Sequence, residues 1–111
     1  MATRKLEKSE WRQTFDTLSR ILGPKQVEVE VAGLPLGDQI VAEWVPLDGV
    51  VYDPKDDVAE LALEGIDHLI SHPREIWIDD EDGVLSRLEI VDAEGTRHIV
   101  YFRDPLMLPA A

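Results

Sequence analysis

Residues 9–31 read SEWRQTFDTLSRILGPKQVEVEV, and the hydrophobic period changes in the middle of this stretch. In the first half, apolar side chains recur at helical spacing, at Trp11, Phe15, Leu18 and Leu22. This spacing predicts one amphipathic helix over about residues 9–22. Ser9 supplies an N-cap. Gly23 and Pro24 end the helix, because glycine accepts the left-handed backbone of a helix end and proline cannot continue the helix.

After Pro24 the period becomes two, which is typical of half-buried strands. In the first of these strands Val27, Val29 and Val31 alternate with polar residues. Further alternating runs predict strands at about residues 40–45, 50–52, 58–63, 75–79, 85–91 and 96–102. The connections between the runs have hairpin length, so neighbouring strands are expected to be antiparallel.

The expected fold class is α+β, within a single domain of residues 1–111. One N-terminal amphipathic helix is followed by an antiparallel sheet of six to seven short strands, over about residues 26–103. The sheet either stays open with the helix on one face or curls into a small barrel of the SH3/Sm type. Asp48-Gly49 is a hairpin-turn signal within it. Residues 66–72 fit either a short helical turn or the continuation of a strand.

Charge is distributed unevenly along the chain. The 11 Lys and Arg residues and 23 Asp and Glu residues give a net charge of −12. Residues 1–25 have a net charge of +3, and the remaining 86 residues have a net charge of −15. An acidic body repels nucleic-acid phosphates and anionic membranes, so neither is an expected partner. The basic segment is either a solvated helix face beside the acidic body or a docking handle.

The composition also bears on the cellular compartment. The chain contains no cysteine, which excludes disulfides and thiolate metal sites and is typical of a reducing compartment. No apolar run approaches the roughly 18–20 residues of a membrane span. The first 20 residues lack the apolar region of a secretion signal. A cytoplasmic protein is therefore expected.

Motifs for catalysis or metal binding are absent or incomplete. His68 and His72 have the spacing of zinc ligands on a helix, but no Glu follows the first histidine and no cysteine is present. His98 alternates with Val100 and Phe102, as a residue on a half-buried strand face does. No serine lies in a G-x-S-x-G motif, and the glycine motifs for phosphate and dinucleotide binding are absent. We therefore expect no catalytic residue, no metal site and no cofactor.

An acidic run at residues 79–83, Asp-Asp-Glu-Asp-Gly, resembles a calcium-binding loop. When Gly83 is aligned with the invariant glycine of that motif, the first ligand position falls on Ile78, which has no ligating atom. The run therefore predicts an acidic hairpin turn in which Gly83 supplies a positive φ.

The C-terminal residues 104–109, Asp-Pro-Leu-Met-Leu-Pro, are apolar and bracketed by prolines, so they are expected to be extended. One interpretation is that residues 104–111 form a strap that seals the core or a sheet edge. The other is that they form a peptide that docks into a second subunit or a partner.

Several short motifs extend over nearly the whole chain: Arg4-Lys5-Leu6, Ser9-Glu10-Trp11, Leu36-Gly37-Asp38-Gln39, Tyr52-Asp53-Pro54-Lys55, Leu63-Glu64-Gly65, Asp67-His68-Leu69-Ile70, Pro73-Arg74-Glu75-Ile76 and the closing D-P-L-M-L-P. In these motifs the chain resembles a family of small bacterial proteins defined as a domain of unknown function. The resemblance implies a bacterial, cytoplasmic protein and implies no activity, cofactor or catalytic residue.

Three polar residues of these motifs have no evident role in a turn, namely Asp67, His68 and Arg74. Together with Trp77 they form the candidate functional patch. The favoured hypothesis is a non-catalytic binding or regulatory module that acts through a protein partner or through self-association. The alternative is a small-ligand-binding or hydrolytic domain with a pocket around Asp67, His68 and Arg74. Nucleic-acid binding, suggested by analogy with Sm barrels, is opposed by the acidic charge.

Overall fold

A computed structural model describes residues 3–23, 25–33, 35 and 37–109. Its elements are β1 (Thr3–Lys5), the 3-10 helix η1 (Lys8–Glu10), α1 (Trp11–Ile21), β2 (Gln26–Ala32), β3 (Gln39–Asp53), β4 (Val58–Leu63), β5 (Ile66–Ser71), β6 (Pro73–Glu81), β7 (Val84–Asp92) and β8 (Arg97–Met107). The α+β class with one short helix and a large antiparallel sheet is confirmed.

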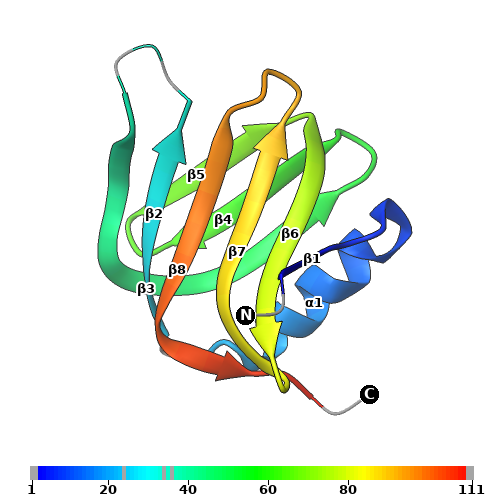
Figure 1. Cartoon of the computed structure of the whole chain (residues 1–111), viewed down its shortest axis with the longest axis vertical. Coiled ribbons are helices and arrows are strands. Elements are labelled where there is room, and N and C mark those ends of the chain that lie inside the picture. Colours follow the sequence, from blue (N-terminus) through cyan, green and yellow to red (C-terminus); the bar gives the residue numbers. More distant parts are fainter. Residues whose placement is uncertain (1–2, 24, 34, 36, 110–111) are drawn as a thin grey trace.

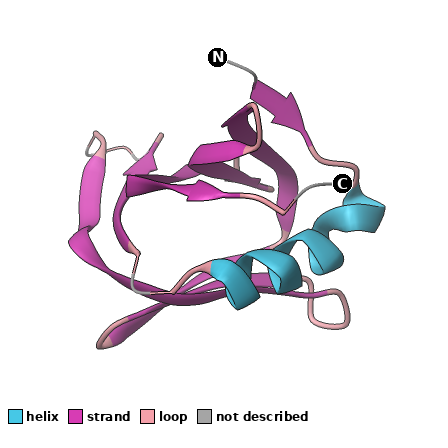
Figure 2. Ribbon diagram, turned by 90° about the horizontal axis from the view of Figure 1, so that it is seen from below, coloured by secondary structure: helices cyan, strands magenta, loops and turns pink. Residues whose placement is uncertain are grey.

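The eight strands of the described chain form one antiparallel sheet in the order β1-β6-β7-β8-β2-β3-β4-β5. The 15-residue strand β3 pairs with β2 through residues 39–46 and with β4 through residues 47–53. Because β3 belongs to both parts, the sheet folds back on itself, and β4 and β5 pass behind β2, β8 and β7 (Figure 1). The apolar faces of the two layers enclose the core (Figure 2).

Two details of the expected sheet are wrong. The sheet has eight strands rather than six or seven, because residues 3–5 and 66–71 are also strands, while the expected strands 40–45 and 50–52 form the single strand β3. The helix is not the first element, since β1 precedes it and pairs with β6. Of the two expected arrangements the structure has the open one, because β1 and β5 remain at the two edges and the sheet does not close into a barrel. The sequence does not reveal β1, because its three exposed residues show no alternation of apolar and polar side chains. Its pairing with β6 uses backbone hydrogen bonds, which leave no such pattern.

Helix α1 spans Trp11–Ile21 and η1 precedes it, close to the predicted helix of residues 9–22. Its apolar stripe is buried against β3, where the Trp11 and Tyr52 rings meet edge to face at 5.1 Å. Ser19 adds a polar contact, because its hydroxyl donates to the Val50 carbonyl at 2.7 Å and accepts from the Val50 N–H at 2.9 Å. No helix in the described ranges has the length and apolar character needed to cross a membrane.

The Asp48-Gly49 signal does not form a hairpin. Both residues lie inside β3, and the register with β4 shifts between Leu47 and Gly49. Gly49 lies close to α1, since a Cβ there would lie 3.6 Å from the Ser19 hydroxyl oxygen. The dipeptide therefore marks an irregularity of β3 beside the helix rather than a turn.

The structure also places the acidic turn between β6 and β7 and the described part of the C-terminal segment. Asp82 and Gly83 both have positive φ and link β6 to β7, which confirms the acidic hairpin turn. Residues 104–107 continue β8, and Leu106 pairs with Leu85 of β7. The Leu108 N–H donates to the Gly83 carbonyl at 2.7 Å, so the extended C-terminal segment lies along the sheet.

We expect Leu106→Ala to lower the free energy of unfolding by about 2–5 kcal/mol, because this side chain is 2% exposed and its removal leaves a cavity. The neighbouring Met107 is 68% exposed and is the matched control. Met107→Ala is expected to change stability by less than about 0.5 kcal/mol. Urea unfolding measures both, and equal losses would contradict the assignment of residues 104–107 to the folded sheet.

Candidate functional site

Three chain connections meet at one end of the sheet, and His72 joins them. It is the single residue between β5 and β6. Its backbone N–H donates to the Asp57 carbonyl at 2.8 Å, and its carbonyl accepts from the Ala93 N–H at 2.9 Å. Its φ is +55°, in the left-handed region that costs a non-glycine residue free energy. The β3–β4 turn, the β5–β6 link and the β7–β8 turn are thus held together by one backbone unit.

A hydrogen-bonded chain of three side chains crosses between the layers beside this link. His68 of β5 lies 2.9 Å from His98 of β8, Nε2 to Nδ1. The Nε2 atom of His98 lies 3.0 Å from Oδ2 of Asp92, at the end of β7. His98 is 7% exposed, so both of its ring nitrogens need partners, and both have them.

The ionised carboxylate of Asp92 determines which atoms donate and which accept along these hydrogen bonds. Burial alone would raise the pKa of Asp92, but hydrogen bonds from His98 and from the Glu94 and Thr96 amides outweigh it and lower that pKa. With Asp92 ionised, His98 donates from Nε2 and accepts at Nδ1 from His68. Burial and the nearby His98 ring lower the pKa of His68. Neutral His68 then keeps its lone pair on Nδ1, where the next proton binds.

A second Asp–His pair lies on the other side of the link. Nδ1 of His72 is 3.3 Å from Oδ2 of Asp57, and the Tyr52 hydroxyl donates to Oδ1 at 2.8 Å. The hydrogen bond from Tyr52 is the main cause of a lowered Asp57 pKa. Burial, that hydrogen bond and the acidic neighbours Asp57 and Asp53 raise the pKa of Tyr52 to about 12. The His72 side chain is exposed, so its ion pair contributes little stability.

A hollow of about 240 Å³ separates the two pairs, and its walls include Ser71, His72, Asp92 and His98. Among the described serines, none has its hydroxyl hydrogen-bonded to a histidine. No group of three or more His, Asp or Glu side chains within the described ranges is arranged to hold a metal ion. The site can therefore exchange protons, but it lacks a nucleophile paired with a base.

The four residues of the candidate patch do not converge. Asp67 is exposed on β5, and His68 binds His98 instead. Arg74 donates to the Ala93 carbonyl at 3.3 Å, and the Trp77 indole N–H donates to Glu75 at 3.0 Å on β6. No hydrogen bond or ion pair joins any two of the four in the described part of the chain.

Sequence reasoning missed the partners of His68. Asp92 lies in the connection between the expected strands 85–91 and 96–102, and His98 was expected on a half-buried strand face. The alternation of His98 with apolar residues indicated its burial, which the structure shows. The pairing across layers had no local signal, because it depends on the bend in β3 that brings β5 over β8.

The free edge of the sheet at β5 is the second notable feature of this region. β5 pairs with β4, and no other backbone hydrogen bond of β5 occurs among the described residues. Ile66 and Leu69 are 60% and 61% exposed. Residues 56–73 contain five acidic residues and no Lys or Arg. The β5 edge is thus unpaired, exposes two apolar side chains and lies in an acidic segment of the chain.

Comparison with known proteins identifies the family. Residues 2–111 match DUF5335, described as a family of unknown function. The chain belongs to the DUF5335 family. An uncharacterised protein from Aquifex aeolicus (strain VF5) is 46% identical over 110 residues, which cover 98% of this chain and 99% of that protein. This relative supports the bacterial origin expected for a DUF5335 protein. No solved structure matches the chain. Membership of DUF5335 assigns no chemistry, so function must be argued from the geometry.

We expect stability to fall as the pH drops below about 6.5, the ordinary pKa that His68 regains on unfolding. The folded state holds this pKa lower, so the unfolded chain binds the proton first and is favoured in acid. Urea unfolding between about pH 7.5 and pH 5 measures the loss.

The variant His68→Gln is expected to flatten this dependence, since glutamine still donates to Nδ1 of His98 but does not titrate in this range. His72→Gln removes an exposed histidine from the same corner and is the control. If wild type and His68→Gln show the same slope, the assignment to His68 is wrong.

Proposed function

We propose that the protein is a non-catalytic protein-binding module of the bacterial cytoplasm, which takes up an extended segment of a partner at the edge of β5. The contrast between the two sheet edges carries this proposal. β1 is three residues long and contains Arg4 and Lys5, and short, charged edge strands resist pairing with another chain. β5 lacks lysine, arginine and proline, and it exposes Ile66 and Leu69.

The β5 edge offers both main-chain and side-chain contacts. A partner strand can pair with the backbone groups of β5 that face away from β4. Asp67, Leu69 and Ser71 share the outer face, because alternate strand residues point to the same side. Leu69 therefore provides an apolar contact beside the negative charge of Asp67.

The surrounding charge specifies the partner. Because residues 56–73 carry five acids and no Lys or Arg, a basic segment gains electrostatic attraction that an acidic one lacks. The expected ligand is an extended protein segment in which basic and apolar residues alternate. The same charge disfavours a nucleic acid, and it disfavours a second copy of this chain with its net charge of −12.

The test uses a synthetic peptide, blocked at both ends, in which lysine and valine alternate. Hydrogen exchange of the backbone amides, measured by NMR, is expected to slow at alternate residues of β5 when the peptide is added, because those N–H groups become paired. A peptide of alternating glutamate and valine tests the charge requirement and is expected to bind at least about tenfold more weakly.

Leu69→Lys is expected to weaken peptide binding about tenfold, because it puts a charge on the docking strand. Val51→Lys is the matched control, since Val51 is 45% exposed but lies on β3, where it pairs with Glu60 of β4 rather than at the β5 edge. Unchanged exchange at β5, or equal weakening by both substitutions, would refute docking at this edge. Concentration-dependent dimerisation blocked by Leu69→Lys alone would assign the edge to self-association instead.

A second candidate function is binding or hydrolysis of a small molecule at the hollow beside His72. The chain from Asp92 through His98 favours it, because it presents a neutral His68 that can accept a proton. The sequence placed this alternative function in a pocket around Asp67, His68 and Arg74. Thermal-shift screening of wild type against His98→Asn separates it from strand docking, which does not need the imidazole chain.

A further inference from the structure

The basic N-terminal segment encloses a hollow that the docking proposal does not use. Between β1 and η1 the chain crosses the start of β6, where the Leu6 N–H donates to the Ile76 carbonyl at 2.8 Å. This crossing brings Lys5 and Lys8 beside Arg74 of β6. The three cations line a hollow of about 290 Å³, together with Leu6, Glu7 and Trp11. We call this space the basic hollow.

Two of these cations form no ion pair in the described part of the chain, although Lys8 is close enough to Asp57 to lower the pKa of that carboxyl. Lys5 lies 3.8 Å from Glu75, but neither Lys8 nor Arg74 takes part in an ion pair within the described ranges. The chain has 23 acidic residues for 11 basic ones, so partners are abundant. Arg74 uses one guanidinium nitrogen, Nη1, on the Ala93 carbonyl, and its remaining donors stay available.

Lys8 also connects the basic hollow with a second one. Its Nζ atom lies 5.7 Å from the centre of the Trp11 ring. The second hollow, of about 530 Å³, is lined by Lys8 and by Arg12, which likewise forms no ion pair among the described side chains. Asp57 faces this second space, but its carboxylate already binds Tyr52 and His72.

Cationic donors dominate the lining of the basic hollow. Lys8 and Arg74 form no ion pair among the described residues, and the buried indole N–H of Trp11 has no hydrogen-bond partner. Glu7 is the one carboxylate among the lining residues named for this space. The positive charge of this lining contrasts with the net charge of −12 of the whole protein.

We propose that the basic hollow binds the phosphate group of a small molecule, at a surface separate from the β5 edge. The planar guanidinium of Arg74 suits two oxygens of one phosphate, and Lys8 neutralises its second charge. A ligand with at least two negative charges is needed, because a single charge gains less from the local cations against the long-range repulsion of the acidic body. The tetrahedral oxyanion therefore fits this site better than a monocarboxylate.

The test titrates inorganic pyrophosphate into protein whose tryptophan indoles carry ¹⁵N. The Trp11 N–H resonance is expected to shift, because that ring lines the basic hollow, while the Trp44 resonance remains in place. Acetate, a monocarboxylate, at the same ionic strength is the comparison for general attraction of anions. The proposed site requires at least about tenfold weaker binding of acetate.

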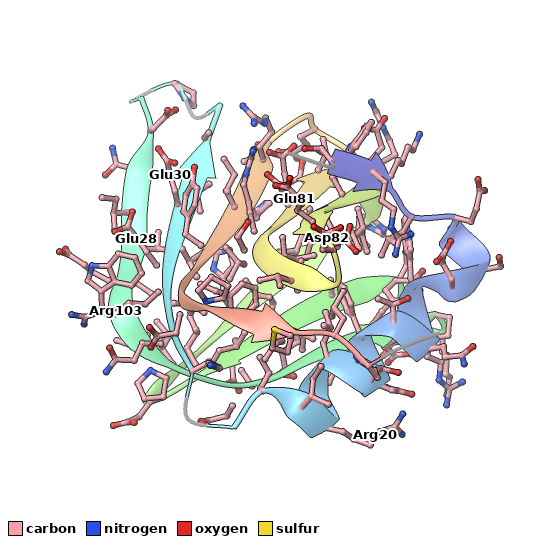
Figure 3. All side chains as sticks on the ribbon, turned by 60° about the horizontal axis from the view of Figure 1, so that its bottom comes forward. Arg20, Glu28, Glu30, Glu81, Asp82 and Arg103 are labelled. Atoms are coloured by element: carbon pink, nitrogen blue, oxygen red, sulfur yellow. The ribbon has the colours of Figure 1, made fainter. Side chains whose placement is uncertain are left out.

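Arg74→Gln and Lys8→Gln are each expected to weaken pyrophosphate binding about tenfold. Arg103→Gln is the matched control, because it changes the net charge equally and lies at the opposite side of the molecule from η1 (Figure 3). This control is expected to change affinity by less than about twofold. Heteronuclear spectra without ligand show that each variant is folded.

Each outcome of this test either supports or overturns the phosphate site. A Trp11 shift that is lost in Arg74→Gln and Lys8→Gln and kept in Arg103→Gln supports the site. No shift, a shift equal with acetate, or equal weakening by all three substitutions overturns it. Peptide docking at β5 uses a different probe and different reporter amides, so failure here leaves that proposal untouched.

Discussion

The bend in β3 is the constraint on which the rest of the structure depends. One strand pairs with β2 in its first half and with β4 in its second, so the backbone of β3 joins the two layers directly. Ser19 binds both backbone groups of Val50 just after the bend, and the apolar stripe of α1 covers the strand there. The position of β5 over β8, the meeting of the turns and the free edge all follow from this bend (Figure 2).

The chain of Asp92, His98 and His68 gives the interior a polar connection where apolar packing would be the simpler solution. A buried imidazole with both nitrogens paired costs little, whereas removal of one partner leaves an unsatisfied group. Such a connection specifies which strand lies over which, because only one register brings these donors and acceptors into contact. It accepts one further proton at His68, whose pKa is lowered by burial and by the nearby His98 ring.

Local patterns predicted the elements, while the assembly depended on contacts between distant residues. The helix of residues 9–22 and the Asp82-Gly83 turn were predictable because their causes lie within a few residues. Asp48-Gly49 was misread because a dipeptide that is common in hairpin turns also occurs at irregularities within a long strand. For the candidate site, His68 was selected from sequence, but its partners Asp92 and His98 were not, since they adjoin it only after the sheet folds back.

The single-residue link at His72 also governs what docking would cost in entropy. β5 is held by β4 along its length, by His98 from below and by a one-residue connection at its end, so it has little conformational freedom to lose. A bound segment would therefore bear nearly all of the ordering cost itself. Partners that are already extended and stiff before binding should be preferred over flexible ones of the same composition.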